Sequence, residues 1–240
     1  MEDFKKHLGT KSDYVQAIFD SIAANYDIMN RFISLGLDQL WRKQTVDLIE
    51  IEGEAKILDL ACGTCDLTII LAEKINKQGQ ITGVDFSENM LEQGAKKIKA
   101  KSLGDKINLI HGDAREIPFA ANYFDCVTIS FALRNTADIK VVLSEIKRVT
   151  KPRGKIVILD IFKPTLLGYR ELFLFYFNKL IPLVGKLIYN QYQEYRWLPQ
   201  SLNQFITNKE LQEIFNELEL KEAKVKKFIL GGVCMHLAEK

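Results

Sequence analysis

The chain has 240 residues, with 47% hydrophobic and 27% charged side chains and a formal net charge of +2. These values are typical of a globular protein with one domain, and they exclude an argument from charge for a nucleic-acid partner. The start of the chain, from Met1 to Thr10, is polar and lacks the apolar core of a signal peptide, and no apolar run reaches the ~20 residues that span a bilayer. We therefore expect a cytoplasmic protein and keep open a peripheral contact with a membrane.

The segment that follows this polar start is predicted to be helical. Apolar side chains recur at helical spacing from Ile18 to Met29, and a second helical pattern runs from Leu40 to Ile49. Gly36 lies in the break between the two patterns. Within a single domain that spans residues 1–240, we expect residues 11–50 to form a helical lid over a ligand pocket.

From Lys56 onward, short apolar strands alternate with helices. Strands are predicted at 56–60, 80–85, 106–111, 124–131 and 155–161, with helices at 67–75, around Met90 and at 138–149, and with a turn at 152–154. This alternation indicates a parallel sheet with helices on both faces. After a helix at 208–218, residues 224–230 and 233–238 flank Gly231-Gly232 and are typical of an antiparallel hairpin.

Residues 162–205 interrupt the alternation and are predicted to be a helical insertion. The stretch 166–189 is rich in Leu, Phe, Tyr and Ile, but it also carries Arg170, Glu171, Lys179 and Lys186. It is too charged to span a membrane and is therefore interpreted as amphipathic helices.

A glycine-containing loop at residues 59–66 follows the first predicted strand, where doubly wound sheets bind their ligands. Asp85 ends the second strand, about 20 residues beyond the loop, where a carboxylate accepts hydrogen bonds from a ribose diol. The dinucleotide fingerprint G-x-G-x-x-G is absent, so the loop favours S-adenosylmethionine, which has no phosphate, over NAD. Asp113 follows the third strand and could accept from an adenine amino group. The alternative for the loop is a plain structural turn.

Three stretches together resemble one family, the ubiquinone/menaquinone biosynthesis C-methyltransferases of the UbiE/MenG type. The first is residues 19–30, which contain Tyr-Asp-Ile-Met-Asn and continue to Ser34-Leu35-Gly36 and Trp41-Arg42. The second is residues 58–64 with 66–68 around the loop, and the third is residues 124–135, which end in Phe-Ala-Leu-Arg-Asn. The resemblance implies an α/β fold of the class I S-adenosylmethionine-dependent methyltransferases, with a Rossmann-like, mostly parallel seven-stranded sheet and an antiparallel C-terminal hairpin. With the loop, it assigns the cofactor site to Asp59, Gly63, Thr64, Asp85, Asp113, Ala114 and Ser130.

The resemblance further implies transfer of a methyl group to a ring carbon of a polyprenylated quinol. Arg134 could stabilise a phenolate, and Asn135 could orient the same oxygen. Tyr26, Asp27 and Asn30 are further candidates for substrate contact. Arg134 could alternatively pair with a helix carboxylate, and Tyr26 could belong to the core.

The acceptor that we expect is demethylmenaquinol. The alternatives are the benzoquinol precursor of ubiquinone, another small acceptor, and a non-catalytic scaffold that binds S-adenosylmethionine. The polyprenyl tail needs an apolar tunnel, which residues 166–198 could supply. The same side chains could instead form a homodimer interface or simple core; they are Phe173, Phe175, Phe177, Leu180, Leu183 and Tyr189.

Two residues depart from the family pattern. Cys65 stands where the family usually has glycine, so its side chain could crowd the methionine end of the cofactor, and Asp38 replaces a frequent histidine. The spacing Cys62-x-x-Cys65 would also suit a redox pair or half of a zinc site. Cys126 and Cys234 are not spaced as a second pair, so we expect small-residue filling of the loop and no metal.

Overall fold

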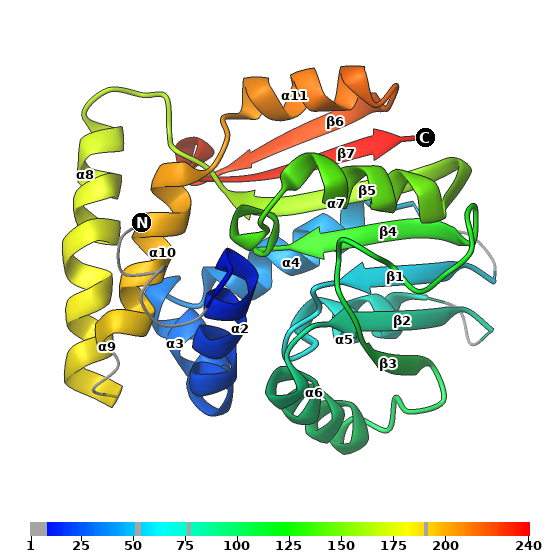
Figure 1. Ribbon diagram of the computed structural model, residues 1–240, viewed down its shortest axis with the longest axis horizontal. Helices are drawn as coiled ribbons and strands as arrows, with labels where there is room; N and C mark the ends of the chain where they lie inside the picture. The colour runs from blue at the N-terminus through cyan, green and yellow to red at the C-terminus, as the bar shows by residue number, and fades with distance from the viewer. Residues whose placement is uncertain (1–8, 51–53, 76–77, 190–191) are drawn as a thin grey trace.

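A seven-stranded sheet forms the centre of the computed structural model, which describes residues 9–50, 54–75, 78–189 and 192–240 (Figure 1). The strand order is β3-β2-β1-β4-β5-β7-β6, and β7 runs antiparallel to both of its neighbours while β1 to β5 are mutually parallel. The predicted fold class is therefore confirmed. The polar residues 1–8, used above to predict location, lie outside the described residues. The strands are β1 (Lys56–Leu60), β2 (Gln80–Asp85), β3 (Ile107–His111), β4 (Phe124–Ser130), β5 (Thr150–Ile161), β6 (Lys221–Phe228) and β7 (Val233–Glu239).

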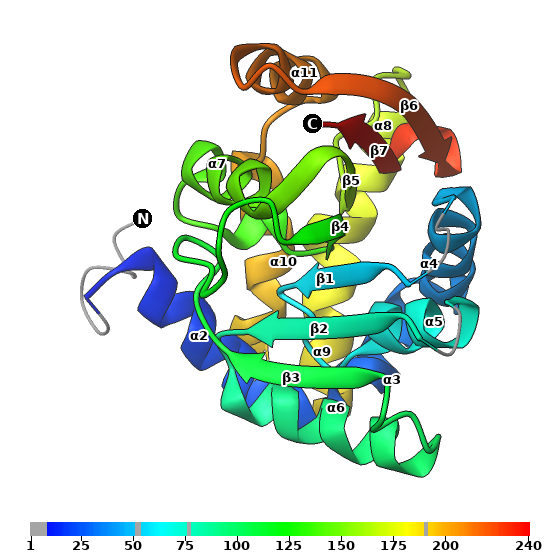
Figure 2. The same cartoon turned by 90° about the vertical axis from the view of Figure 1, so that its right-hand side faces the viewer.

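Helices cover both faces of the sheet (Figure 2). On one face, α4 (Leu37–Leu48), α5 (Asp66–Lys74) and α6 (Glu88–Ala100) contribute to an apolar cluster around Ile57 and Ile81. On the other, α7 (Ile139–Val149) and α11 (Asn208–Glu217) pack on a cluster around Leu58 and Phe124. Because neighbouring side chains of a strand point to opposite faces, the apolar run of β1 serves both clusters, as expected for a buried parallel strand.

The helices begin where the sequence carries the usual signals. Gly36 has a positive φ of 78° directly before α4, which accounts for the break predicted there. Side chains of Ser87 and Asp138 accept backbone N–H groups at the starts of α6 and α7. Thr207 forms a reciprocal capping box with Glu210 at the start of α11.

The turn predicted at residues 152–154 is instead part of β5, which begins at Thr150. A register shift lies beside Phe124 and Cys126, and Arg153 has a φ of 64°. The N–H of Arg153 donates to the carbonyl of Lys240 at 2.8 Å, and the N–H of Lys240 donates to the carbonyl of Gly154 at 3.1 Å. The end of the chain thus pairs with this segment and keeps it in the sheet as an irregular strand.

Two helical segments distant in sequence form one layer at the carboxyl ends of the parallel strands, at the left of Figure 1. The first comprises α2 (Lys11–Ile22), a 3₁₀ turn and α3 (Tyr26–Ile33); the second comprises α8 (Tyr169–Phe175), a π-helical turn, α9 (Ile181–Tyr189) and α10 (Tyr192–Gln204). They share a third apolar cluster that includes Ile22, Met29 and Phe177, and the Tyr176 hydroxyl donates to the Ile33 carbonyl at 2.7 Å. None of the helices in the described part of the chain has the length and hydropathy needed to cross a bilayer.

Cys65, near the end of the loop at residues 59–66, is fully buried and packs against α6. Its φ of 66° lies in the left-handed region, which explains why glycine suits this position. A Cβ added to Gly94 of α6 would overlap the Cys65 Sγ, so the thiol fills the space that Gly94 leaves. The thiol therefore points into the protein interior, and the crowding of a cofactor that we considered above does not follow from its position.

This packing predicts coupling between the two positions. Gly94→Ala should lower the free energy of unfolding by about 1–3 kcal/mol because the new methyl group overlaps the Cys65 sulfur. In a Cys65→Gly background the same substitution should cost little, and urea unfolding of the four proteins measures the difference. Gly104, which has nothing within 4 Å of an added Cβ, provides the control Gly104→Ala. Equal costs of Gly94→Ala in both backgrounds would contradict this account.

Candidate active site

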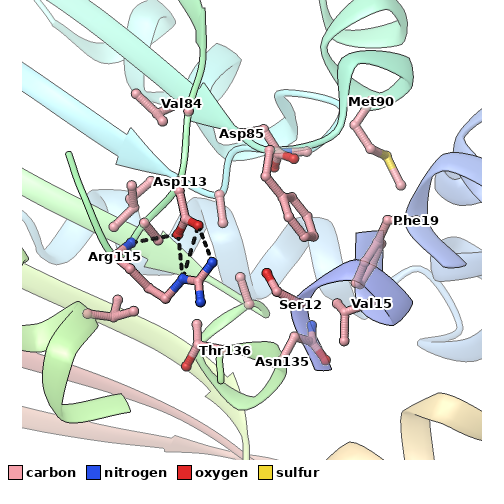
Figure 3. A pocket seen from close by; sticks show the side chains of 18 of the residues that line it. Ser12, Val15, Phe19, Val84, Asp85, Met90, Asp113, Arg115, Asn135 and Thr136 are labelled. Carbon is pink, nitrogen blue, oxygen red and sulfur yellow. Dashed lines mark hydrogen bonds and ion pairs between the residues drawn. The ribbon is translucent and has the colours of Figure 1, made fainter. Parts of the chain in front are cut away.

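A first cavity of about 90 Å³ lies at the carboxyl ends of β1, β2 and β4 (Figure 3). The loop after β1 forms one wall, and the N-terminal helix α2 faces it with Ser12, Val15 and Phe19. Gly63 has a φ of 54° and nothing within 4 Å of an added Cβ, so backbone is exposed to the cavity there. The predicted residues that line it are Gly63, Asp85, Asp113, Ala114, Ser130 and Asn135, together with Tyr26.

Asp85 is the buried carboxylate of this cavity, with 5% of its surface exposed. One oxygen accepts from the N–H of Gly63 at 2.7 Å and the other from the N–H of Ser87 at 2.9 Å. Burial raises the pKa of Asp85 to about 6, because desolvation outweighs the two hydrogen bonds that favour the charged form. The carboxylate therefore holds the glycine loop against the end of β2 and keeps its remaining acceptor capacity for a ligand.

Asp59 and Thr64, also predicted for the cofactor site, do not line this cavity. Asp59 is fully buried below the loop, where its oxygens accept from the hydroxyls of Thr68 at 2.6 Å and Thr128 at 2.8 Å. Burial raises its pKa to about 6 as well. The Thr64 hydroxyl donates to Asp27 at 2.5 Å. In this structure the hydrogen bonds of both side chains hold the loop, and their assignment to the cofactor site stays a prediction.

Asp27 belongs to a polar network that ties the helical layer to the loop. Its second oxygen accepts from Lys97 of α6 at 2.7 Å, and Lys97 also pairs with Asp66, the first residue of α5. Arg31 of α3 joins the same Asp66 at 2.7 Å. Although burial raises it, the pKa of Asp66 falls to about 2, because the nearby cations Arg42, Lys97 and Arg31 favour its ionised form. Asp27, predicted as a substrate residue, thus lies in this network and lines neither cavity described here.

Asp113 carries an ion pair inside the first cavity. Arg115 wraps back onto it, with Nη2 2.6 Å from Oδ2 and Nε 3.0 Å from the same oxygen, as the dashed lines in Figure 3 show. These hydrogen bonds lower the pKa of Asp113 below its usual value. A ligand that uses the Asp113 carboxylate must therefore share it with Arg115 or displace that side chain.

A second, larger cavity of about 480 Å³ adjoins the first. Tyr26 and Phe131 line both cavities and mark their junction. Burial raises the pKa of the Tyr26 hydroxyl. Asn30 and Arg134 also lie in the wall of the second cavity. The rest of the lining is mainly apolar and comes from both helical segments and from α4; it includes Ile33, Leu37, Trp41, Phe173, Phe175, Phe177 and Leu180. Leu183 does not line it, and the side chain of Tyr189 lies outside the described residues.

Arg134 and Asn135 divide between the two cavities. Arg134 lines the second, and its Nη1 donates to Asp160 Oδ1 at 2.6 Å and to the Phe131 carbonyl at 2.6 Å. Its carboxylate partner comes from strand β5, not from a helix. Asn135 lines the first cavity and accepts from the indole N–H of Trp197 at 3.0 Å. The pairing with Asp160 fixes the guanidinium at the wall without excluding contact with a ligand.

Sequence analysis missed three residues of this region. Asp160 had a signal, since a carboxylate inside the apolar run of β5 is rarely buried without a partner. Arg42 and Phe131 were noted only as parts of family stretches. The cysteines gave no further site: Cys62 and Cys65 are buried thiols with Sγ atoms 4.0 Å apart, and no cluster of three metal-ligating side chains occurs among the described residues.

Solved structures of low sequence identity share the fold. A methyltransferase from Aquifex aeolicus that depends on S-adenosylmethionine matches with a TM-score of 0.61 at 16% identity, over 82% of this chain and 88% of that chain. The cyclase SpnF matches with a TM-score of 0.65 at 15% identity, over 84% and 80%. The fold alone therefore does not determine the reaction.

Sequence relatives are more specific. Demethylmenaquinone methyltransferases from Bacillus cereus (strain ATCC 10987 / NRS 248) and Bacillus anthracis (strain CDC 684 / NRRL 3495) are 43% and 42% identical over 231 residues, which is 96% of this chain and 97% of theirs. The model of the ubiE/COQ5 methyltransferase family matches residues 7–240. The resemblance predicted from three stretches is confirmed over nearly the whole chain. This chain belongs to the ubiE/COQ5 methyltransferase family and is an enzyme that transfers methyl groups from S-adenosylmethionine.

Proposed function

We propose that the enzyme methylates a ring carbon of demethylmenaquinol to give menaquinol. The relatives that carry this activity in their names are 42–43% identical to the chain over nearly its full length. The observation that carries the proposal is the junction of two cavities, one with a buried carboxylate at a glycine loop and one that is large and apolar, at Tyr26 and Phe131. A cofactor and a lipid-like acceptor can meet there.

We propose the first cavity as the cofactor site. Asp85 would accept from the ribose hydroxyls, Gly63 would let the backbone approach the ligand, and Asp113 would face the adenine amino group. Its volume of about 90 Å³ is far below the roughly 300–1,000 Å³ of ligand pockets, so the walls must open for a nucleoside to enter. The helices of residues 11–50 are the proposed lid, because α2 closes the side opposite the loop.

We propose that Arg134 stabilises the quinol as a phenolate. The bound cofactor supplies a methyl group on a sulfonium, which needs little further activation. A ring carbon becomes nucleophilic when the phenolic oxygen ortho to it loses its proton, so the protein must favour that anion. Arg134 offers a fixed guanidinium in the wall of the acceptor cavity, and Asn135 lies next to it in the first cavity. The carbon that gains the methyl group then loses its own proton, which restores the aromatic ring.

We further propose that the mouth of the second cavity contacts a membrane. Leu35, Leu172 and Phe175 line the cavity and are also exposed, and Leu167, in the loop before α8, is 82% exposed. Arg170 and Lys179 are exposed on the same helical segment and would favour anionic lipid head groups. A polyprenyl tail could then pass from the bilayer into the cavity without crossing water. The alternative to a membrane is that a second copy of the chain covers this surface.

The principal test is methyl transfer itself. With labelled S-adenosylmethionine and reduced demethylmenaquinol, the enzyme should form a product whose label survives hot hydriodic acid, which cleaves aryl methyl ethers, because the new bond joins two carbons. Arg134→Gln combined with Asp160→Asn, which avoids an orphaned carboxylate, should lower kcat by about 10²-fold or more while cofactor affinity persists. Lys209→Gln, which changes an exposed side chain of α11 that lines neither cavity, is the control. Preference for a benzoquinol would support the ubiquinone step instead, and absence of any turnover would contradict the proposal.

The raised pKa of Asp85 predicts a pH dependence of cofactor affinity. Ribose hydroxyls donate to the ionised carboxylate, so affinity should be full above pH 7 and should fall as the pH drops through about 6, by up to about tenfold per unit. Calorimetric titrations from pH 5 to 8 should show this slope in the wild type but not in the weaker-binding Asp85→Asn. In Asp59→Asn the slope should persist at a lower pH, because the Asp59 charge also raises the pKa of Asp85. Stability of the free protein has the opposite sign: the contribution of Asp85 is present below pH 3.8 and is lost as the pH rises through about 6. A slope that survives in Asp85→Asn would refute the assignment.

Membrane contact predicts binding to vesicles. The protein should sediment with vesicles of phosphatidylcholine and phosphatidylglycerol, and Leu167→Ser with Leu172→Ser should weaken this several-fold, because two exposed apolar side chains are removed. Val141→Ser, which changes an exposed apolar side chain of α7, is the matched control. A concentration-dependent dimer that the leucine substitutions abolish, without vesicle binding, would assign the surface to a second copy.

A further inference from the structure

Arg42 is a second buried guanidinium in the wall of the acceptor cavity. It lies on α4 and is 5% exposed, and Arg134 is 7% exposed in the same wall. The Arg42 guanidinium carbon lies 4.8 Å from the centre of the Phe131 ring, and Arg134 donates to the carbonyl of that same Phe131. The two guanidinium groups therefore flank the residue at which the two cavities meet.

Each guanidinium keeps donor capacity that the protein does not use. Arg42 Nη1 donates to Asp38 Oδ2 at 2.9 Å, and Arg134 Nη1 serves Asp160 and Phe131. The Nε atoms of both arginines are buried and have no hydrogen-bond partner among the described residues. A buried N–H without a partner costs free energy, so a purely structural role would leave both groups poorly placed.

Arg42 is also not the sole partner of its carboxylate. Asp38 accepts from Arg31 as well, and the Ser34 hydroxyl donates to it at 2.9 Å. An apolar side chain could fill the place of Arg42 in this wall, since Leu37 and Trp41 of the same helix already do so at neighbouring positions. The second cation therefore matches a ligand with polar atoms inside an otherwise apolar cavity.

A 1,4-quinol presents two oxygens on opposite sides of its ring. We propose that Arg134 donates to the oxygen beside the carbon that is methylated, and that Arg42 is a further substrate-binding residue that donates to the other oxygen. The inference rests on the proposed function and deepens it, because it makes the enzyme selective for a ring with two para oxygens. Each guanidinium presents several N–H donors from a planar fork, which suits a phenolic oxygen in either protonation state.

The experiment compares two substrates and two matched variants. The substrates are a short-tailed demethylmenaquinol and its deoxy analogue, in which hydrogen replaces the hydroxyl beside the tail, so that only the oxygen beside the methylated carbon remains. The variants are Arg42→Met and Arg31→Met, because each removes one of the two cations that share Asp38, while Arg31 lines neither cavity. The quantity measured is kcat/KM for each substrate, with cofactor affinity measured by calorimetry.

For the wild type we expect the quinol to be favoured over the deoxy analogue by about 10- to 100-fold, the range of one hydrogen bond with a charged group, here the guanidinium. Arg42→Met should lower kcat/KM for the quinol by that factor, leave kcat/KM for the deoxy analogue within about threefold and so abolish the selectivity. Arg31→Met should keep the selectivity, because any structural damage affects both substrates equally. Arg42→Lys, which retains a charge, should give an intermediate ratio, and it serves as the test variant if Arg42→Met does not fold.

Two failures can be told apart. If the wild type methylates the quinol and Arg42→Met and Arg42→Lys both keep the wild-type selectivity, the role of Arg42 is wrong and the proposed function stands. If the wild type methylates no quinol, while it binds S-adenosylmethionine, the proposed function is wrong and the role of Arg42 with it.

Discussion

The reversal of strand order between β1 and β4 is the constraint on which the structure depends. From β1 the sheet grows in one direction through β2 and β3 and in the other through β4 and β5, so the connecting helices leave from this point to opposite faces. The carboxyl ends of β1 and β4 are left open at one edge. The loop with Gly63, the carboxylate of Asp85 and the end of β4 at Ser130 all come together there because the topology gives them no other neighbours.

A helical layer covers this opening, and polar contacts rather than apolar packing alone hold it over the loop. Arg31 of α3 pairs with Asp66, the first residue of α5. Asp27 of α3 accepts from the Thr64 hydroxyl of the loop and pairs with Lys97 of α6. A charged group with several hydrogen-bond partners has few alternative positions, so the network restricts the position of α3 more than apolar packing would. Asp38 takes part in this arrangement as the shared partner of Arg31 and Arg42.

The parts of the fold that depend on local pattern could be predicted from sequence. The five parallel strands, the glycine loop, Asp85 and the C-terminal hairpin each have a signal within a few residues. Positions set by distant contacts could not be predicted. Lys240 pairs with residues 153–154 and keeps the predicted turn within β5. Arg115 forms an ion pair with Asp113. The contact of Arg42 with Phe131 depends on the packing of α4, which the local sequence does not indicate. The hydrogen bonds of Asp59 to Thr128 and of Thr64 to Asp27 likewise depend on residues that are distant in sequence.

The helical layer also has a consequence for folding during synthesis. Ile33 and its partner Tyr176 are 143 residues apart, so α2 and α3 leave the ribosome long before α8 to α10 exist to cover them. At about 5–20 residues per second, that interval is on the order of ten seconds. Val15, Ile18, Ile22 and Met29 would face water or a chaperone for this time, while β1 to β5 can already pair. The second cavity, whose wall includes Phe173 and Leu198 of these later helices, is therefore among the last parts of the molecule to be completed, and a ribosome that stalls before residue 170 would release a chain that lacks this wall.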